Sequence, residues 1–373
     1  SCGPERSRAI TELRTAMRIR AHGPRTMSKA AKIRAFDPNS PGDANAQMYG
    51  LPFTCEEADI VLLPVPWEVT TSYGGGTAHG PQAIFDASFQ VDLFHPEFPD
   101  LWKRGVAMDE MPKALLQQSK ALKKEAHKVI TMLTEGGSKK ELAQAKKALE
   151  LVNAECAVMN EWVEARAGEW LDAGKLVGLV GGDHSTPLGF HRALARRHKR
   201  FGILHIDAHM DLRNAYEGFT YSHASIMHNT LELPQVDTLV QVGIRDFCAE
   251  ENKAFLDQNG RVKVVRSADI RRQQFEGVTW REQCDAIIAA LPEKVHVSFD
   301  IDGLDPVLCP HTGTPVPGGL AFEEATYLLS RLVASGRTLI GFDLVEVAPG
   351  RHDEWDANVG ARLLWHLCGV LAR

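Results

Sequence analysis

The sequence predicts an α/β protein in which a doubly wound, mostly parallel β-sheet lies between two layers of helices. About seven short apolar runs alternate with helical segments, a pattern typical of strands that are buried on both faces. Three of these runs end in clusters of Asp and His, and doubly wound sheets bind ligands beyond the carboxyl ends of their strands. The 373 residues, 44% hydrophobic and 24% charged, suffice for one such three-layer domain.

Composition argues against two classes of partner. The formal net charge of −6, without a long basic stripe, argues against a nucleic-acid surface. No apolar run approaches the ~20 residues that span a bilayer, so no membrane partner is expected.

The seven cysteines are scattered and never spaced Cys-x-x-Cys, and no secretory signal is evident. We therefore expect reduced thiols in a cytoplasmic protein.

The amino-terminal part divides into an arm and the start of the domain. Residues 1–50 lack a sustained period and are expected to form a surface arm, disordered at its start, whereas residues 51–373 form the domain. Residues 58–67 are a continuous apolar run and predict the first strand. The glycine-rich stretch 70–81 lacks the lysine and spacing of a phosphate-binding loop and is interpreted as a flexible loop near a site. A helix is expected over 81–94, since Pro81 suits its first turn.

Residues 112–172 differ in texture, being rich in Ala, Leu, Lys and Glu with one break at 135–138. Two helical faces follow from the spacing of apolar residues, namely Leu115, Leu122, Val129 and Leu133, then Leu142, Leu149, Val152 and Trp162. This segment is interpreted as a helical hairpin inserted between sheet elements. It serves either as a decoration or oligomer contact, or as a lid over the site.

Beyond residue 175 strands and helices alternate regularly. A helix is expected from the turn at 181–186 to about residue 200. The predicted strands are 176–180, 201–206, 237–243, 262–265, 295–299 and 338–344.

Acidic and imidazole side chains follow three of these strands. If the chain stays extended after residue 206, residues two apart point to the same side of the sheet. Together the three strand ends predict a metal site rather than isolated caps or turns. The expected ligands are His184, Asp207, His209, Asp211, Asp300 and Asp302. Asp183 and Asp305 break the parity of their neighbours and suit supporting or turn roles.

The number and type of these ligands predict two metal ions. Six ligands are too many for one Zn²⁺, and four carboxylates balance the charge of two divalent cations. Oxygen-rich ligands with imidazole favour Mn²⁺, with Ni²⁺ and Co²⁺ as alternatives. Two such ions ~3.5 Å apart would generate hydroxide at neutral pH, so hydrolysis is the expected reaction.

The motifs GGDHS, DAHMD, SFDIDGLDP and HTGTP resemble those of the ureohydrolases, which include arginase, agmatinase, guanidinobutyrase and formimidoylglutamase. The resemblance covers roughly residues 60–367 apart from the insert, and it implies an arginase-like fold. It also implies that His184, Asp207, Asp211 and Asp300 bind one ion while Asp207, His209, Asp300 and Asp302 bind the other. Asp207 and Asp300 would then bridge the two ions.

The same resemblance implies two catalytic residues. His223, in YSHAS, takes the place of the histidine that transfers protons to the leaving amine, and Glu346, in DLVEV, that of the acid that holds the guanidinium. The chemistry is consistent, because a protonated guanidinium is a planar fork that a carboxylate holds well. Attack on its carbon and protonation of the departing nitrogen release urea. His228 is interpreted as structural.

The substrate depends on the segment between Asp211 and His223, which departs from arginase and typical agmatinase. Arg213 could hold a substrate carboxylate or disfavour a cationic tail. Three aromatic residues either narrow the pocket or belong to the core: Trp67, Tyr216 and Phe219.

SHASIM, CPHTGTPVPGG, the arm and the insert look most like a subgroup often labelled agmatinase, whose members hydrolyse free guanidine and use Ni²⁺. Guanidine is therefore the expected substrate, giving urea and ammonia with Ni²⁺ or Mn²⁺, and Thr71 and Thr77 are candidates to bind it. The alternative is an agmatinase or guanidinobutyrase.

Two rival classes remain open at this point. A deacetylase with one zinc ion is the nearest enzyme, and His209 and Asp302 argue against it. A non-catalytic assembly protein would use its metals only to stabilise the fold. The family resemblance further implies homotrimers or homohexamers, and nickel loading would involve a metallochaperone.

Overall fold

The computed structural model describes residues 27–43 and 46–373. The chain divides into two compact units, Ser1–Phe36 and Asp37–Arg373. In the first unit the described residues form helix α2 (Lys29–Ala35), which begins where the Ser28 hydroxyl accepts a hydrogen bond from the backbone N–H of Ala31 (3.3 Å). The expected disorder at the start of the arm falls outside the described residues.

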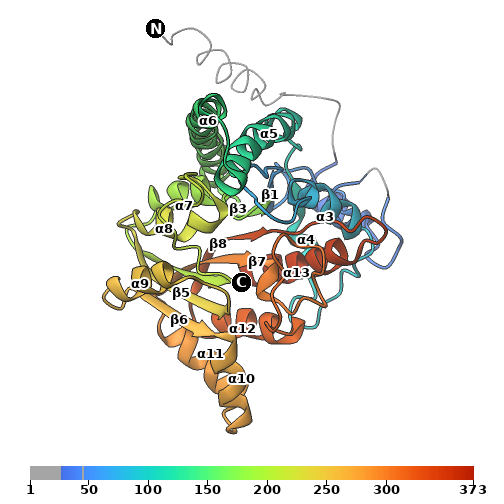
Figure 1. Cartoon of the computed structure of the whole chain (residues 1–373). Coiled ribbons are helices and arrows are strands. Elements are labelled where there is room, and N and C mark those ends of the chain that lie inside the picture. Colours follow the sequence, from blue (N-terminus) through green and yellow to red (C-terminus); the bar gives the residue numbers. More distant parts are fainter. Residues whose placement is uncertain (1–26, 44–45) are drawn as a thin grey trace. The chain divides into compact units, whose positions relative to one another are not determined.

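The second unit is built on one eight-stranded sheet in which every paired strand is parallel (Figure 1). The strand order is β2-β1-β3-β8-β7-β4-β5-β6. The strands are β1 (Ile60–Val65), β2 (Val106–Met108), β3 (Leu176–Gly181), β4 (Phe201–Ile206), β5 (Val236–Ile244), β6 (Val262–Arg266), β7 (Lys294–Asp300) and β8 (Thr338–Val345). The predicted doubly wound parallel sheet is confirmed. The missed strand, β2, is an edge strand too short to carry a pattern.

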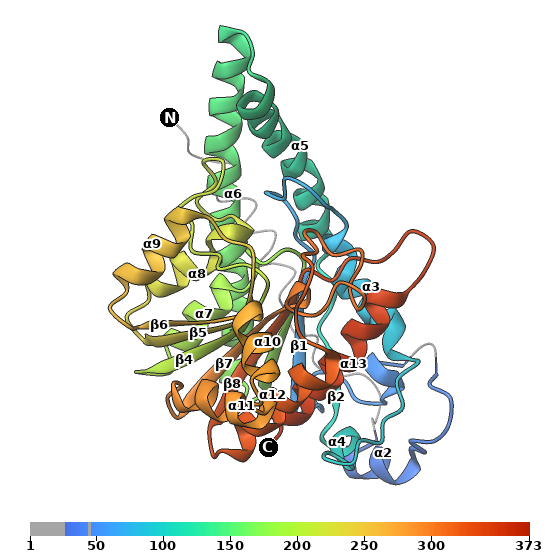
Figure 2. The ribbon, with the colours of Figure 1, turned by 60° about the horizontal axis from the view of Figure 1, so that its bottom comes forward.

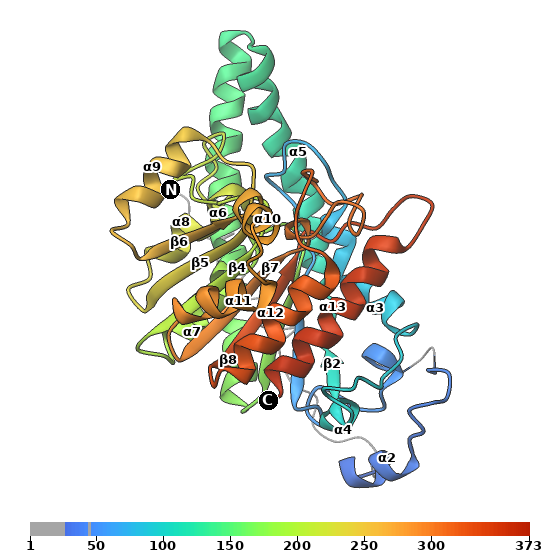
Figure 3. The ribbon, with the colours of Figure 1, turned by 90° about the horizontal axis from the view of Figure 1, so that it is seen from below.

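Two layers of helices cover the sheet, as Figures 2 and 3 show. Strands β1 and β4 are buried along their whole length, because side chains on both faces meet helices. One layer contains α5 (Lys113–Glu135), α6 (Lys139–Asp172), α7 (Leu188–Ala195) and α8 (Ile226–Leu231). The other contains α3 (Gly80–Ser88), α11 (Trp280–Ala289), α12 (Phe322–Ala334) and α13 (Trp355–Leu371). Helices α4 (Leu101–Arg104), α9 (Ala249–Asp257) and α10 (Ser267–Phe275) complete the unit.

Two helices end earlier than their sequences suggest. Helix α3 stops at Ser88 and α7 at Ala195, whereas the predicted ends were near residues 94 and 200. The residues that follow continue as turns and bends, so both predicted helices extended past the observed ends.

The predicted hairpin insert is present as α5 and α6, which extend together beyond the sheet (Figure 2). Its turn is closed by a capping box, in which the Ser138 N–H donates to Glu141 Oε2 (2.7 Å) and the Glu141 N–H donates to Ser138 Oγ (3.3 Å). Leu115, Leu122 and Val129 are buried, as the helical period predicts. Leu133 and Leu142, predicted on the same faces, are 60% and 54% exposed near the tip. Among the described residues none covers these two leucines, since the tip projects past the sheet.

The topology brings four strand ends together. Strands β3, β8, β7 and β4 are neighbours in the middle of the sheet, although they come from distant parts of the chain. Because all four run parallel, their carboxyl ends meet at one edge. Every predicted metal ligand follows or ends one of these strands.

The described cysteines form no disulfide bonds with one another, and Cys2 lies outside the described residues. Among the helices of residues 27–43 and 46–373, none has both the length and the apolar character that crossing a membrane requires.

His366 on α13 makes stability depend on pH. Burial, with nearby His95, lowers the pKa of His366 from 6.5 to about 4, so the folded chain keeps this ring neutral. In the unfolded chain the His366 imidazole has its ordinary pKa of 6.5 and becomes protonated below that pH. The free energy of unfolding therefore decreases as the pH falls from 6.5 to 4, by at most about 3 kcal/mol from this group.

We expect His366→Gln to lose this part of the acid sensitivity. The measurement is chemical denaturation of the metal-free protein at pH 7 and pH 5, with wild type beside the variant. Equal losses of unfolding free energy in the two proteins would contradict the assignment to His366.

Candidate metal centre

The turn after β3 brings His184 to the sheet edge. Gly182 packs so closely that a Cβ atom there would lie 1.9 Å from the carbonyl oxygen of Trp67, so only glycine fits. Asp183 turns away from the centre, and its carboxylate accepts hydrogen bonds from the N–H groups of Ser185 (2.9 Å) and Val69 (3.3 Å). The supporting role expected for Asp183 agrees with these contacts.

Three carboxylates converge around His184 Nδ1. The distances from this nitrogen are 3.0 Å to Asp207 Oδ2, 3.2 Å to Asp211 Oδ2 and 3.2 Å to Asp300 Oδ2. Ligand atoms about 2.1 Å from one octahedral ion lie about 3 Å apart, so this spacing suits a shared cation. These are the residues predicted for the first ion.

A second group shares Asp207 with the first. His209 Nδ1 lies 3.4 Å from Asp207 Oδ1 and 3.1 Å from Asp302 Oδ2. Asp207 thus faces one group with each carboxylate oxygen, as a bridging ligand does. Asp300 approaches the first group through Oδ2, and its Oδ1 accepts the N–H of Asp302 (2.8 Å). Bridging by Asp300 stays a prediction.

The convergence does not come from an extended chain. Strand β4 ends at Ile206, and Asp211 has a positive φ of 54°. After β7, residues Ile301–Gly303 form the 3-10 turn η4. The assumption that alternate residues of a strand share one side was therefore wrong beyond residue 206. Turns aim the side chains, and the N–H groups of Met227 and His228 hold the Asp211 carbonyl oxygen (3.1 and 3.2 Å).

The charges of the cluster require cations. His184 Nδ1 is buried without a hydrogen-bond partner although three carboxylates surround it. Burial, together with the charge of Asp207, raises the pKa of Asp211 to about 6. Burial and the charges of Asp302 and Asp207 likewise raise the pKa of Asp300 well above its ordinary value. Two divalent ions would relieve this repulsion, so the residues fit a binuclear centre.

His205 is a member of the site that the sequence reasoning missed. It lies within β4, fully buried, and its Nε2 is 2.7 Å from Asp207 Oδ2. The Gln241 amide nitrogen lies 2.9 Å from His205 Nδ1, which places the ring proton on Nε2. His205 therefore donates to the central carboxylate. Its position two residues before Asp207 on a strand was the available signal.

A series of buried hydrogen bonds also supports the His184 ring on its Nε2 side. Its Nε2 lies 3.0 Å from Ser298 Oγ, which donates to Asp343 Oδ1 (2.8 Å). Asp343 Oδ2 is held by His296 Nε2 at 2.7 Å. This chain fixes the orientation of the ring so that Nδ1 faces the carboxylates.

Glu346 closes the other side of the cluster. It follows β8 with a φ of 63°, a left-handed conformation that costs a glutamate on the order of 1–3 kcal/mol. Its Oε1 accepts the N–H of His184 (2.9 Å). Burial, with the charges of Asp300 and Asp183, raises the pKa of Glu346 well above its ordinary value. A cationic substrate would stabilise the charged carboxylate here.

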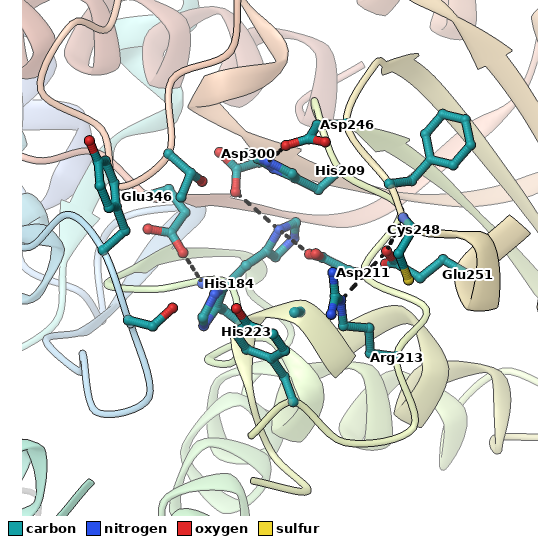
Figure 4. A pocket seen from close by; sticks show the side chains of 16 residues that line it. His184, His209, Asp211, Arg213, His223, Asp246, Cys248, Glu251, Asp300 and Glu346 are labelled. Carbon is teal, nitrogen blue, oxygen red and sulfur yellow. Dashed lines mark hydrogen bonds and ion pairs between the residues drawn. The ribbon is translucent and has the colours of Figure 1, made fainter. Parts of the chain in front are cut away.

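His184, Asp211 and Asp300 of the first group and His209 of the second border a cavity of about 310 Å³, and His223 also lines it (Figure 4). His223 stands at the start of the short turn His223–Ser225, and Ser222 Oγ lies 3.3 Å from its Nδ1. Burial, with His209 and His184, lowers the pKa of His223 to about 4. The ring is neutral at pH 7 and able to accept a proton.

Arg213 and Glu346 occupy opposite sides of this cavity (Figure 4). The Arg213 guanidinium stacks over Tyr216, 4.6 Å from the ring centroid, and its Nε lies 3.6 Å from Glu251 Oε2. One wall of the cavity therefore carries a fixed positive charge, with Glu251 and Glu217 as acidic neighbours.

The remaining predicted contacts divide between cavity and core. Tyr216 borders the cavity, whereas Trp67 and Phe219 are fully buried in the hydrophobic core. Thr71 donates its hydroxyl to Glu68 (3.3 Å), and the Thr77 hydroxyl is buried. The cavity is bordered instead by their neighbours Ser72 and Tyr73. Substrate binding by Thr71 and Thr77 stays a prediction.

Comparison with known proteins identifies the family. The family model described as arginase family matches residues 58–369. The chain belongs to the arginase family. It is 32% identical over 314 residues to an N(1)-aminopropylagmatine ureohydrolase of Synechocystis sp., covering 84% of this chain and 89% of that protein. It is also 32% identical over 219 residues to a guanidinobutyrase of Pseudomonas aeruginosa, covering 56% and 65%.

Solved structures show the same fold. An agmatine ureohydrolase of Thermoplasma volcanium superposes with a TM-score of 0.66 at 23% identity, covering 91% of this chain and 97% of that chain. An arginase of Medicago truncatula superposes with a TM-score of 0.62 at 25% identity, covering 84% and 87%. The predicted arginase-like fold is confirmed.

Family membership confirms the class of enzyme. Arginase-family ureohydrolases are metal-dependent hydrolases of guanidino compounds, and the family uses a binuclear divalent metal centre. The predicted ureohydrolase is confirmed at this level. A mononuclear zinc deacetylase and a non-catalytic assembly protein do not fit the family assignment.

The two ligand groups predict separable metal sites. Asp302 belongs only to the second group, so Asp302→Asn should weaken that site while the four ligands of the first remain. We expect about two ions per chain in the wild type and about one in the variant, measured by elemental analysis after loading and desalting. Asp305→Asn is the matched control, because Asp305 follows the same turn outside both groups and its Oδ1 accepts the N–H of Val307 (3.0 Å). Two ions retained by Asp302→Asn would exclude Asp302 as an essential ligand.

Proposed function

We propose that this ureohydrolase acts on free guanidine and releases urea and ammonia, with Ni²⁺ or Mn²⁺ as its metal. The observation that carries the proposal is the charged wall formed by Arg213. The cavity has room for more than a guanidinium, so its volume does not select the substrate. The charge on its wall must do so instead.

Glu346 is the residue that we propose holds the substrate. Its Oε1 is engaged by the His184 backbone, and its Oε2 faces Gly313, where a Cβ would lie 3.4 Å away. Because Gly313 has no side chain, a planar guanidinium has room to reach this oxygen. When bound, the two ions supply an activated water for hydrolysis. The carboxylate fork then fixes the plane of the group to be attacked.

His223 is placed to move the proton. Being neutral at pH 7, it accepts the proton released on attack and gives it to the departing nitrogen, which leaves as ammonia. Tyr216 meets its ring edge-on, with centroids 5.9 Å apart, and this contact restricts how the imidazole rotates.

The positive wall disfavours the substrates of several relatives. Agmatine and N(1)-aminopropylagmatine carry a cationic tail. With the guanidino group on Glu346, such a tail would extend toward Arg213 across the cavity (Figure 4). Like charges at this range repel by about 1 kcal/mol or more. Guanidine has no tail and avoids this cost.

A guanidino acid is the second candidate, because Arg213 could pair with its carboxylate. Arg213 is already stacked on Tyr216 and lies near Glu251, so a substrate carboxylate would compete with that acid. This competition favours guanidine over 4-guanidinobutyrate. Assembly into homotrimers or homohexamers, and nickel loading by a metallochaperone, belong to the same proposal and rest on the family resemblance.

The direct test is urea release from guanidine, agmatine, 4-guanidinobutyrate and arginine by protein loaded with Ni²⁺ or with Mn²⁺. We expect kcat/KM for guanidine to exceed the others at least ~10-fold, and Glu346→Gln and His223→Asn to lose ~100-fold or more. His228→Asn serves as a control, since His228 lies outside the cavity lining. A preference for agmatine with Mn²⁺ would overturn the substrate assignment.

Removing the wall charge should change specificity. Arg213→Gln is expected to raise kcat/KM for agmatine about 10-fold relative to guanidine, because the repulsion of the cationic tail disappears. Arg192→Gln is the matched control, since Arg192 lies over Tyr221 (6.0 Å) in the same manner but away from the cavity. If the ratio of kcat/KM for agmatine to kcat/KM for guanidine were unchanged in Arg213→Gln, Arg213 would not determine substrate selection.

A further inference from the structure

A glycine-rich loop borders the cavity on the side of Glu346. The cavity loop, residues 70–76, follows β1 and contributes Ser72 and Tyr73 to the cavity wall. Gly74 packs directly on Gly313, and a Cβ atom on Gly74 would lie 2.3 Å from the carbonyl oxygen of Gly313. Because Gly313 neighbours the Glu346 carboxylate, the position of this loop affects where the guanidinium sits.

One buried carboxylate organises the cavity loop. Glu68 is 4% exposed, and its Oε2 accepts hydrogen bonds from the N–H groups of Gly76 (2.7 Å) and Ala78 (3.2 Å). Its Oε1 accepts the hydroxyl of Thr71 (3.3 Å). Both ends of the loop are thus tied to a single side chain.

Helix α5 of the insert supplies the partners of Glu68. Lys123 Nζ forms an ion pair with Glu68 Oε1. One turn earlier, Ser119 Oγ accepts the backbone N–H of Glu68 (2.8 Å). Residues four apart lie on one helical face, so α5 presents a matched pair to this residue. Gly75 packs at the contact, since a Cβ there would lie 3.0 Å from Glu68 Oε1 and 3.1 Å from Lys123 Nζ.

We propose that Lys123 and Glu68 are positioning residues through which the helical insert sets the cavity loop for substrate binding. A carboxylate buried in this way needs its counter-charge, and without Lys123 it would turn toward water. The N–H groups of Gly76 and Ala78 would then lose their acceptor, and the loop would lose its defined position against Gly313. The kinetic part of this inference rests on the proposed function.

The test compares Lys123→Met with Lys124→Met, an exposed lysine of the same helix. With the substrate that the wild type hydrolyses best, we expect Lys123→Met to raise KM about 10-fold while kcat changes less than ~3-fold. Lys123→Arg should restore KM because it keeps the charge, and metal content should match the wild type in all three variants. A KM unchanged in Lys123→Met, or raised equally in Lys124→Met, would overturn the inference.

Amide hydrogen exchange gives a readout that needs no activity. In Lys123→Met the amides of Gly76 and Ala78 should exchange at least ~10-fold faster than in wild type, while those of β4 stay unchanged. If the wild type released no urea from any guanidino compound, the proposed function would fail, and exchange would still decide the role of Lys123. Unchanged exchange at both amides would reject the coupling. Faster exchange throughout the domain, with loss of metal, would show that Lys123 only stabilises the fold in general. That result would also reject the coupling between the insert and the cavity loop.

Discussion

The constraint on which the structure depends is the burial of several carboxylates at one edge of a parallel sheet. Asp207, Asp211, Asp300, Asp302 and Glu346 are each at most 7% exposed. Such a cluster cannot remain ionised without nearby positive charge, because the free energy of burying each charge adds to the repulsion between them. Two bound divalent cations would supply this positive charge, so the same ions would stabilise the fold and serve catalysis.

The topology explains how such a cluster is assembled. Strands β3, β8, β7 and β4 lie side by side, yet in the sequence they are spread between Leu176 and Val345. Each contributes one short turn at its carboxyl end. Beneath the turns, Ser298 of β7 contacts Nε2 of His184, and Asp343 of β8 accepts a hydrogen bond from Ser298. The rigid sheet thus supports both the ligands and their orientation.

The sequence predicted the strands and ligand types well, because apolar runs and charged strand ends are local features. It did not predict how those ligands are aimed. The left-handed φ of Asp211 and Glu346 has no residue signature, as neither is glycine. His205 and its partner Gln241 sit on different strands, so their contact depends on register. Likewise the helical period placed Leu133 on an apolar face without revealing that the side chain is 60% exposed in the described part of the chain.

The insert shows where local pattern and function separate. Its heptad-like spacing indicates only that two helices pack together, and the polar face of α5 reads as solvent-exposed. In the folded chain both Ser119, which is buried beside Leu115 and Leu122, and Lys123 on the polar side of the helix contact Glu68, a residue 51 positions from Ser119. A lysine among many lysines thereby becomes the counter-charge of a buried acid beside the cavity. Because Glu68 anchors the loop that rests on Gly313, and Gly313 adjoins Glu346, a change on the insert can reach the guanidinium site through packed contacts alone.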